Sequence, residues 1–163
     1  YFRQITFLSI ITARFVLEFL TNVVVFSLLS SILWLIGTPP HISDPMLILW
    51  ALFLLSILGA ELGILISIAS IFFPSLDNLN QVIRRTLFFV SGVYFYANEL
   101  PHALRTTLLY NPIFNCIESV RVGFYSGYVS PESSIAYVGV WALAGMFIAL
   151  TIERLARKYA LED

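Results

Sequence analysis

The chain has 163 residues and a mass of 18.4 kDa, and 59% of its residues are hydrophobic whereas only 12% are charged. Soluble domains carry roughly 25% charged and about 45–50% apolar residues, so this composition excludes a water-soluble globule. A formal net charge of −1 provides no general attraction for nucleic acid, which disfavours a nucleic-acid partner. The single cysteine, Cys116, excludes an intrachain disulfide, and no Cys/His cluster has the spacing of metal ligands.

The first long apolar run covers residues 17–37 and predicts a membrane-spanning helix. A helix of about twenty residues is about 30 Å long, which matches the hydrocarbon core of a bilayer. The run ends at Gly37-Thr-Pro-Pro40, so a short aqueous loop should follow over residues 41–45. The sequence opens at Tyr1 without the pattern of a signal peptide, and we expect it to be a piece of a longer polytopic protein.

Two further runs, residues 46–73 and 133–152, are also long enough to cross a membrane, and a basic tail at 153–163 follows the second. Between them, residues 79–97 form a third predicted membrane helix. Its uninterrupted apolar part, Thr86 to Ala97, would measure only about 18 Å, so it should enter the membrane deeply without crossing alone. The predicted fold class is therefore all-α, a polytopic membrane protein with about four membrane helices.

Residues 98–131 have the pattern of two short amphipathic helices broken at Asn111-Pro112. Non-spanning backbone at membrane depth is stable only when protein or a wet cavity surrounds it. We therefore predict a re-entrant helical hairpin on the external side, just before the last span. Glu118 and Arg121 are three residues apart on one helix face, so we expect them to pair and to hold the hairpin in place.

Basic residues are distributed unevenly between the two sides of the predicted spans. Most lie in the N-terminal stretch, in the loop before the third membrane segment and in the tail. Because basic residues in short flanking loops stay on the cytoplasmic side, this asymmetry predicts a cytoplasmic C-terminus and an external hairpin. The predicted inside residues are Arg3, Arg14, Arg84, Arg85, Arg154, Arg157 and Lys158, against Arg105 and Arg121 outside.

Small residues mark one face of the second predicted span. Gly59 and Gly63 have the spacing that lets two membrane helices approach closely, so we predict tight packing on a neighbouring helix. Glu61 lies near mid-span on the opposite face, where contact with lipid would be costly. We expect Glu61 to face protein or water, either as a structural hydrogen-bonding group or as a conduit or proton-coupled residue.

Aromatic residues crowd the hairpin and the segment that precedes it. An aromatic belt at the membrane surface explains such crowding, since tyrosine and tryptophan favour that interface. A stacking surface for the apolar faces of sugar rings is the sharper hypothesis, with tyrosine hydroxyls available for hydrogen bonds.

The sequence contains no Gly-x-x-x-x-Gly-Lys-Ser/Thr phosphate-binding loop, so this chain does not bind ATP by that route. Energy for any transport must come from a partner or a gradient. Catalysis by Glu99 or Glu118 is a weaker hypothesis, because no Ser/His/Asp, Cys/His or paired-carboxylate arrangement occurs at an interpretable spacing.

Several short strings together resemble one family of membrane proteins. They are Ser91-Gly-Val-Tyr-Phe95, Leu100-Pro101, Leu109-Tyr-Asn-Pro112, Glu118-x-x-Arg121 and Gly123-Phe-Tyr125. In this combination the chain resembles the C-terminal half of ABC-2 type permeases, and within that family the bacterial exporters of capsular polysaccharide and O-antigen.

The resemblance implies six spanning helices per subunit, with a re-entrant pair of short helices before the last, and about four of these spans lie in this chain. Residues 1–16 would form the cytoplasmic approach to the third helix, and residues 153–163 the cytoplasmic tail. The first two spans, an amphipathic helix and most of the coupling helix would precede Tyr1, so this piece should not transport alone.

The same resemblance implies a homodimeric permease in the bacterial inner membrane, working with two separate ATPase subunits that bind ATP and Mg²⁺. No cofactor is expected in this chain itself. The cargo would be a lipid-linked polysaccharide, passed outward from the cytoplasm through a conduit surrounded by membrane lipid. The residues expected to contact cargo are Tyr94, Tyr96, Tyr110 and Tyr125, and those expected to shape the outer gate are Glu99, Pro101, Asn111, Pro112, Glu118 and Arg121.

Three alternatives stay open from the sequence. The first is an ABC-2 permease for a drug, a teichoic-acid-like molecule or another lipid. The second is a non-transporting membrane scaffold in which the hairpin is a docking element. The third is an intramembrane enzyme that acts on a lipid-linked sugar with Glu99 and Glu118 as acid and base, which requires the two carboxyls to converge on one cavity.

Overall fold

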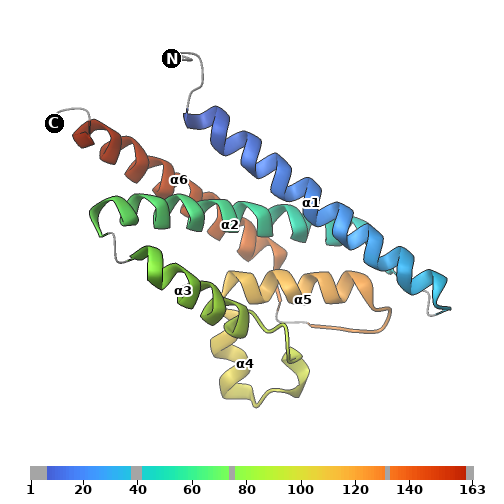
Figure 1. Ribbon diagram of the computed structural model, residues 1–163. Coiled ribbons are helices and arrows are strands. Elements are labelled where there is room, and N and C mark those ends of the chain that lie inside the picture. The colour runs from blue at the N-terminus through green and yellow to red at the C-terminus, as the bar shows by residue number, and fades with distance from the viewer. Residues whose placement is uncertain (1–6, 38–41, 74–75, 131–132, 161–163) are drawn as a thin grey trace.

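The computed structural model describes residues 7–37, 42–73, 76–130 and 133–160, and within these ranges the chain is helical without strands (Figure 1). The predicted all-α fold class is confirmed. The elements in chain order are α1 (Phe7–Leu35), α2 (Pro45–Phe72), α3 (Leu76–Val90), the 3₁₀ helix η1 (Ala97–Glu99), α4 (His102–Leu109), α5 (Pro112–Phe124) and α6 (Ile135–Ala160).

Helices α1, α2 and α6 are long and apolar enough to cross a membrane. They overlap the three long spans predicted at 17–37, 46–73 and 133–152, each of which extends one or two residues past its helix. Helix α1 begins well before the predicted span and α6 continues beyond it, because charged residues interrupt an apolar run without disfavouring the helix itself. The stretches with membrane-spanning character are Ser9–Leu35, Pro45–Ser70 and Ile135–Ala156.

Helix α3 is shorter than the membrane segment predicted at 79–97. It has 15 residues and ends at Val90, which is too short to cross a bilayer. The Ser91 hydroxyl donates to the Phe88 carbonyl at 2.6 Å, and Gly92 has a φ of +79°, the left-handed conformation that commonly follows a helix end. A Ser-Gly pair thus ends the helix inside an apolar run, where hydropathy alone indicates no boundary.

The start of α2 is fixed to the end of α5. An Asp44 carboxylate oxygen accepts hydrogen bonds from the amides of Met46 and Leu47, both at 3.0 Å, which caps α2. The amides of Ser43 and Asp44 in turn donate to the Gly123 carbonyl at 2.9 and 3.0 Å. The loop between the first two spans therefore returns to the hairpin, a tertiary contact that the sequence did not indicate.

Helix α2 is the centre of the packing, in contact with α1, α5 and α6. One apolar cluster joins Leu54 of α2, Cys116 of α5 and Val138 of α6. A second brings Ile11 of α1 and Ala156 of α6 onto the other half of α2. The beginning of α1 and the end of α6 therefore meet at the same end of the molecule, as Figure 1 also shows.

Some predictions fall outside the described residues. These include the first part of the cytoplasmic approach at 1–6, the Pro-Pro turn within 38–41 and the end of the tail at 161–163. Which side of the membrane each end faces stays a prediction.

Gly123→Ala tests the junction between α5 and α2. A Cβ at this position would lie 2.8 Å from both the Asp44 carbonyl oxygen and Ile48 Cγ1, so the backbone must shift. We expect a loss of stability of about 1–3 kcal/mol, measured by denaturant unfolding in micelles. Gly139→Ala in α6 is the matched control, because a Cβ at that position would have no atom within 4 Å. Equal stabilities of the two variants would contradict the contact.

Candidate functional site

Two short helices, α4 and α5, lie in the segment predicted as a hairpin over residues 98–131, and its re-entry into the membrane stays a prediction. Pro101 precedes α4, and its carbonyl accepts hydrogen bonds from the amides of Leu104 and Arg105 at 3.0 Å each. The predicted break between the two helices at Asn111-Pro112 is confirmed. Proline suits both positions because it has no N–H. An N–H at the start of a helix has no carbonyl within the helix to bind, so nothing is lost there.

Asn111 connects the hairpin to α3. Its side-chain oxygen accepts a hydrogen bond from the Ile113 amide at 3.0 Å, which caps α5. Its side-chain nitrogen donates to the Val90 carbonyl at 3.4 Å, at the end of α3. Asn111 and Pro112 therefore fix both the start of α5 and its position beside α3.

Asn115 is a structural residue of the site that the sequence patterns did not single out. It is 1% exposed, and its side-chain nitrogen donates to the carbonyls of Leu109 and Asn111 at 2.5 and 3.2 Å. Its side-chain oxygen accepts a hydrogen bond from the Ser134 amide at 3.1 Å, just before α6. The sequence did contain a signal for this role. An asparagine on the buried side of α5 needs hydrogen-bond partners for both its oxygen and its nitrogen.

Arg121 reaches from α5 to the segment between α3 and η1. One guanidinium nitrogen donates to Glu118 Oε1 at 2.6 Å and to the Phe95 carbonyl at 2.9 Å. The other donates to the Gly92 carbonyl at 2.6 Å. The guanidinium carbon also lies 4.8 Å from the centre of the Tyr96 ring, within cation–π range. The predicted Glu118–Arg121 pair is confirmed, and it binds the irregular segment as well as its own helix.

Glu118 is fully buried and both of its oxygens are engaged. Its Oε2 accepts a hydrogen bond from the Tyr128 hydroxyl at 2.5 Å, and the Tyr128 ring lies 6.0 Å from the Tyr96 ring. Burial raises the pKa of Tyr128, and the hydrogen bond to Glu118 raises it further, so the hydroxyl stays a donor. We call Tyr96, Glu118, Arg121 and Tyr128 the Arg121 cluster.

Gly92 lets the irregular segment lie directly on α5. A Cβ at this position would be 2.5 Å from Phe114 Cδ2, and its φ of +79° is unfavourable for other residues. The rings of Phe95 and Phe114 have centroids 6.2 Å apart, and Phe114 is completely buried. The Ser-Gly pair that ends α3 thus also lets the following segment lie close enough to α5 for Arg121 to reach its carbonyls.

The four tyrosines expected in a conduit, Tyr94, Tyr96, Tyr110 and Tyr125, are all at least 41% exposed. They lie in different surroundings: Tyr94 stacks on Phe89, whereas Tyr96 belongs to the Arg121 cluster. Within the described part of the chain, no ring contact joins two of the four. The structure does not gather them into one stacking surface in a single subunit, and their contact with cargo stays a prediction.

Glu99 and Glu118 are in different environments. Glu99 ends η1 and is exposed, whereas the carboxylate of Glu118 is buried between Arg121 and Tyr128. No oxygen of Glu118 is open to a substrate, and neither carboxyl lines the cleft described below. The arrangement lacks the convergent pair that the enzyme alternative requires.

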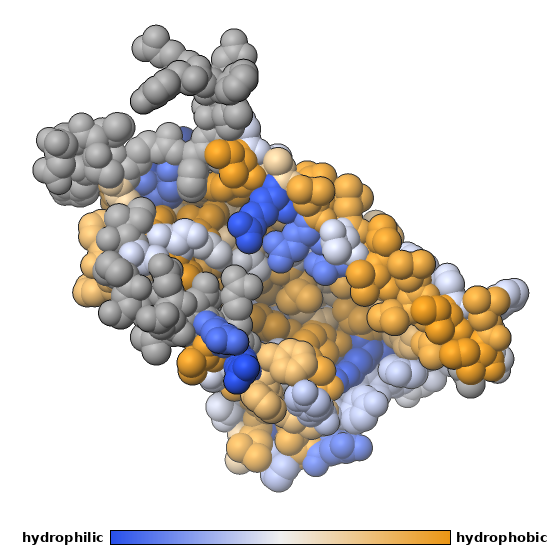
Figure 2. Space-filling view, in the orientation of Figure 1, coloured by the Kyte–Doolittle hydropathy of each residue, from blue (hydrophilic) through white to orange (hydrophobic). Residues whose placement is uncertain are grey.

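A cleft of about 770 Å³ lies between α1, α2, α3 and α5. Its walls are mostly apolar, but Arg14 and Glu18 of α1 also line it. The space-filling view of one face shows several hydrophilic groups among predominantly apolar side chains (Figure 2). This cleft was not predicted, because its walls come from four separate segments of the sequence.

Gly59 and Gly63 line the α2 wall of this cleft. A Cβ at Gly59 would lie 3.7 Å from Glu18 Oε1, an ordinary van der Waals contact with α1. No atom lies within 4 Å of a Cβ placed at Gly63. Among the residues that the structure describes, only Gly59 of the pair faces a neighbouring helix this closely, and tight packing through both glycines stays a prediction.

Glu61 faces the opposite side of α2 and packs against α6. It is 7% exposed, and an ideal Cβ at Gly145 would lie 2.6 Å from its Cδ and Oε1. The expectation that Glu61 faces protein is confirmed. Its Oε2 has no hydrogen-bond partner, so the interhelical hydrogen bond expected under the structural interpretation is not formed at that atom.

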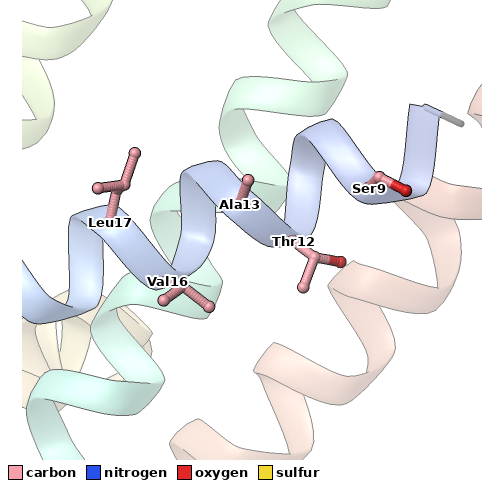
Figure 3. Close-up of a pocket in the computed structure, with 5 residues that line it drawn as sticks. All are labelled: Ser9, Thr12, Ala13, Val16 and Leu17. Carbon is pink, nitrogen blue, oxygen red and sulfur yellow. The ribbon is translucent and has the colours of Figure 1, made fainter. Parts of the chain in front are cut away.

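A second, shallower pocket lies on α1 alone (Figure 3). The labelled residues show that Thr12 and Val16 project to the same side of the helix, whereas Leu17 projects to the other. Small and apolar side chains without a charged group form this surface, so it offers little to orient a polar ligand. The residues that line it are Ser9, Thr12, Ala13, Val16 and Leu17.

Residues 2–125 match the family described as the ABC-2 type transporter, which is well over half of the chain. The chain belongs to the ABC-2 transporter family. Its three long apolar helices, with two short helices before the last, make it a polytopic membrane protein of that family.

Curated ABC-2 relatives include capsule export proteins. The chain is 28% identical over 153 residues to the polysialic acid transport protein KpsM of Escherichia coli, covering 94% of this chain and 59% of the relative. It is 26% identical over 152 residues to the capsule polysaccharide export inner-membrane protein BexB of Haemophilus influenzae, covering 93% and 57%. A protein with the same description, CtrC of Neisseria meningitidis, is 24% identical over 152 residues, also covering 93% and 57%. The chain thus spans less than two thirds of the length of these relatives.

Arg121→Ala should destabilise the hairpin, because it leaves the buried Glu118 carboxylate without its cation. Removing one partner of a buried ion pair typically costs about 3–5 kcal/mol. Limited proteolysis of the segment over residues 91–99 measures the effect, and we expect cleavage to accelerate. Arg85→Ala, which removes an exposed arginine from α3, is the matched control. Identical proteolysis of the two variants would show that the Arg121 cluster does not hold this segment.

Proposed function

We propose that the chain is part of the permease subunit of an ATP-driven exporter that moves a lipid-linked polysaccharide, of capsule or O-antigen type, outward across the bacterial inner membrane. The observation that carries the proposal is the similarity to capsule export proteins over 93–94% of the chain. A homodimer of the permease would enclose the conduit. Two separate ATPase subunits would bind ATP and Mg²⁺ and hydrolyse the nucleotide.

The packing supports a mechanism in which the permease shifts between two arrangements. Helix α5 is held to α2 through Gly123 and to the start of α6 through Asn115. Helix α3 and the segment after it are held to α5 chiefly by Arg121 and Asn111. Force from the ATPase would move α3 relative to α5, and the Arg121 cluster would then define the closed state of the outer gate.

The alternatives predict different partners. A permease for another lipid, a teichoic-acid-like molecule or a drug would keep the ATPase and change the cargo. A scaffold would not co-purify with an ATPase subunit at all. We favour polysaccharide because the relatives with the matching sequence carry that description.

The topology is tested by single cysteines in the full-length protein. We expect Glu99→Cys to react with an impermeant maleimide added to intact spheroplasts, since the hairpin should be external. The matched Arg85→Cys should react only after the membrane is opened. Cys116 can stay in place because burial raises the pKa of its thiol to about 12, which leaves little reactive thiolate. Labelling of Arg85→Cys alone in intact spheroplasts would overturn the topology and the export assignment with it.

The conduit hypothesis is tested by replacing Tyr94, Tyr110 and Tyr125 together with alanine. We expect surface polysaccharide to fall several-fold while co-purification with the ATPase is retained, because sugar stacking is lost but the fold is not. Tyr96 is tested separately as Tyr96→Phe, which keeps the ring beside Arg121. Phe147→Ala, which removes an exposed ring from α6, is the control. Unchanged export in the triple variant would remove these tyrosines from the cargo path.

A further inference from the structure

Glu61 lies in the middle of the apolar interface between α2 and α6. On one side of it, Leu58 of α2 and Ala142 of α6 belong to one buried cluster. On the other side, Ile64 of α2 and Ala149 of α6 belong to the second. Glu61 is three residues from both Leu58 and Ile64, a spacing that keeps all three on the same face of the helix. One carboxyl therefore lies between two groups of buried apolar side chains.

Gly145 of α6 leaves the space that this carboxyl occupies. A Cβ at Gly145 would lie 2.6 Å from the Cδ and Oε1 atoms of Glu61, so a larger residue would displace the carboxyl. Among the described residues, Glu61 Oε2 is buried without a hydrogen-bond partner. Glu61 lies nine residues before the end of the spanning stretch at Ser70, which is about 14 Å and close to the middle of a ~30 Å hydrocarbon core. At this depth no lipid headgroup can reach the carboxyl.

The described side chains of α6 bring no cation to Glu61. The part of this helix before Glu153 contains no charged residue. Glu153 and Arg154 lie eight and nine residues beyond Gly145, which is about 12 and 14 Å along the helix. Tyr137 lies eight residues before Gly145, and its hydroxyl donates to a backbone carbonyl beside α5.

The other helices that contact α2 carry charged or titratable side chains that are either engaged or exposed elsewhere. The pair on α1 lines the cleft, which lies on the face of α2 opposite Glu61. The charged pair on α5 is bound to itself, and the thiol on α5 donates to a carbonyl of α2 at 3.7 Å. These residues are Arg14 and Glu18 of α1, exposed Arg85 of α3, and Cys116, Glu118 and Arg121 of α5.

The surroundings of Glu61 suit a neutral carboxylic acid and not a carboxylate. Burial of an ion without a countercharge costs far more than burial of a neutral polar group, so an isolated buried carboxyl takes up a proton. We propose that Glu61 carries a proton whenever α2 and α6 are packed along this interface, and that opening of the interface to water releases the proton. The proton passes to water as the helices separate and returns from water as they pack.

This arrangement makes the packing of α2 on α6 sensitive to pH. Because the packed form binds one more proton than the open form, acid favours the packed form and alkali favours the open form. The inference goes beyond the proposed export function and does not depend on the cargo. Neither of the measurements below requires transport, so failure of the export assignment would leave their results unchanged.

Infrared spectroscopy of the full-length protein in lipid nanodiscs at neutral pH tests whether Glu61 holds a proton. A protonated carboxylic acid has a carbonyl stretching band that a carboxylate lacks. We expect this band to be lost in Glu61→Gln, which replaces the acid with a neutral amide of the same size. Glu99→Gln, at an exposed carboxyl outside the spans, is the matched control and should leave the band unchanged.

A second variant keeps the infrared test valid if Glu61→Gln does not accumulate. Glu61→Asp retains an acid on a shorter side chain, so the band should shift in frequency and not disappear. A spectrum in which neither variant alters the band would overturn the proposal.

The pH dependence of unfolding tests the link between the proton and the packed interface. A glutamate in water loses its proton above about pH 4.3. Because packed Glu61 keeps its proton above that pH, the folded protein binds more protons than the unfolded one, and stability falls as the pH rises. Between about pH 5 and pH 7, the unfolding constant in mixed micelles should rise by up to tenfold per pH unit relative to that of Glu61→Gln. Equal pH dependence of the two proteins would overturn the proposal.

Discussion

The buried Glu118 carboxylate is the constraint on which the hairpin depends. Removing a carboxylate from water costs several kcal/mol unless a cation and further donors compensate for it. Arg121 and Tyr128 supply that compensation and leave other guanidinium donors for the carbonyls of Gly92 and Phe95. Those carbonyls lie in irregular backbone, where no helix provides donors. The same ion pair therefore stabilises a buried charge and a segment without regular structure.

The two sides of the hairpin are attached differently. On the α2 and α6 side, α5 is fixed by apolar packing around Cys116 and by backbone hydrogen bonds at Gly123. On the α3 side, the side chains of Arg121 and Asn111 add polar contacts to the packing of Gly92 and Phe95 on Phe114. Polar contacts between a few side chains can be exchanged more easily than a packed apolar interface. This difference is the reason the proposed mechanism has α3 move relative to α5.

The sequence predicted the features that depend on local patterns. Apolar runs indicated the three long helices, and the Asn-Pro step indicated the break before α5. The i, i+3 spacing indicated the Glu118–Arg121 pair, because both residues lie on one turn of a helix. Such features need only a few neighbouring residues, so one sequence is enough to recognise them.

The remaining features depend on contacts between distant segments. Hydropathy did not reveal that α3 ends at Val90, because the boundary comes from Ser91 and Gly92 within an apolar run. The partners of the Asn115 side chain lie at the end of α4, in the link to α5 and just before α6, and the cleft beside Arg14 has four walls. The four tyrosines expected to contact cargo lie close together in the sequence, but they do not form one surface. Spatial arrangement of this kind cannot be derived from spacing along the chain.

The length of α6 has a mechanical consequence. Its 26 residues form a rod about 39 Å long, which exceeds the ~30 Å thickness of the hydrocarbon core. No proline lies between Ile135 and Ala160, so every residue of the helix keeps its backbone N–H. Its first turn follows Ser134, whose amide donates to the Asn115 side chain, so this long rod is joined to α5 at the end next to the hairpin.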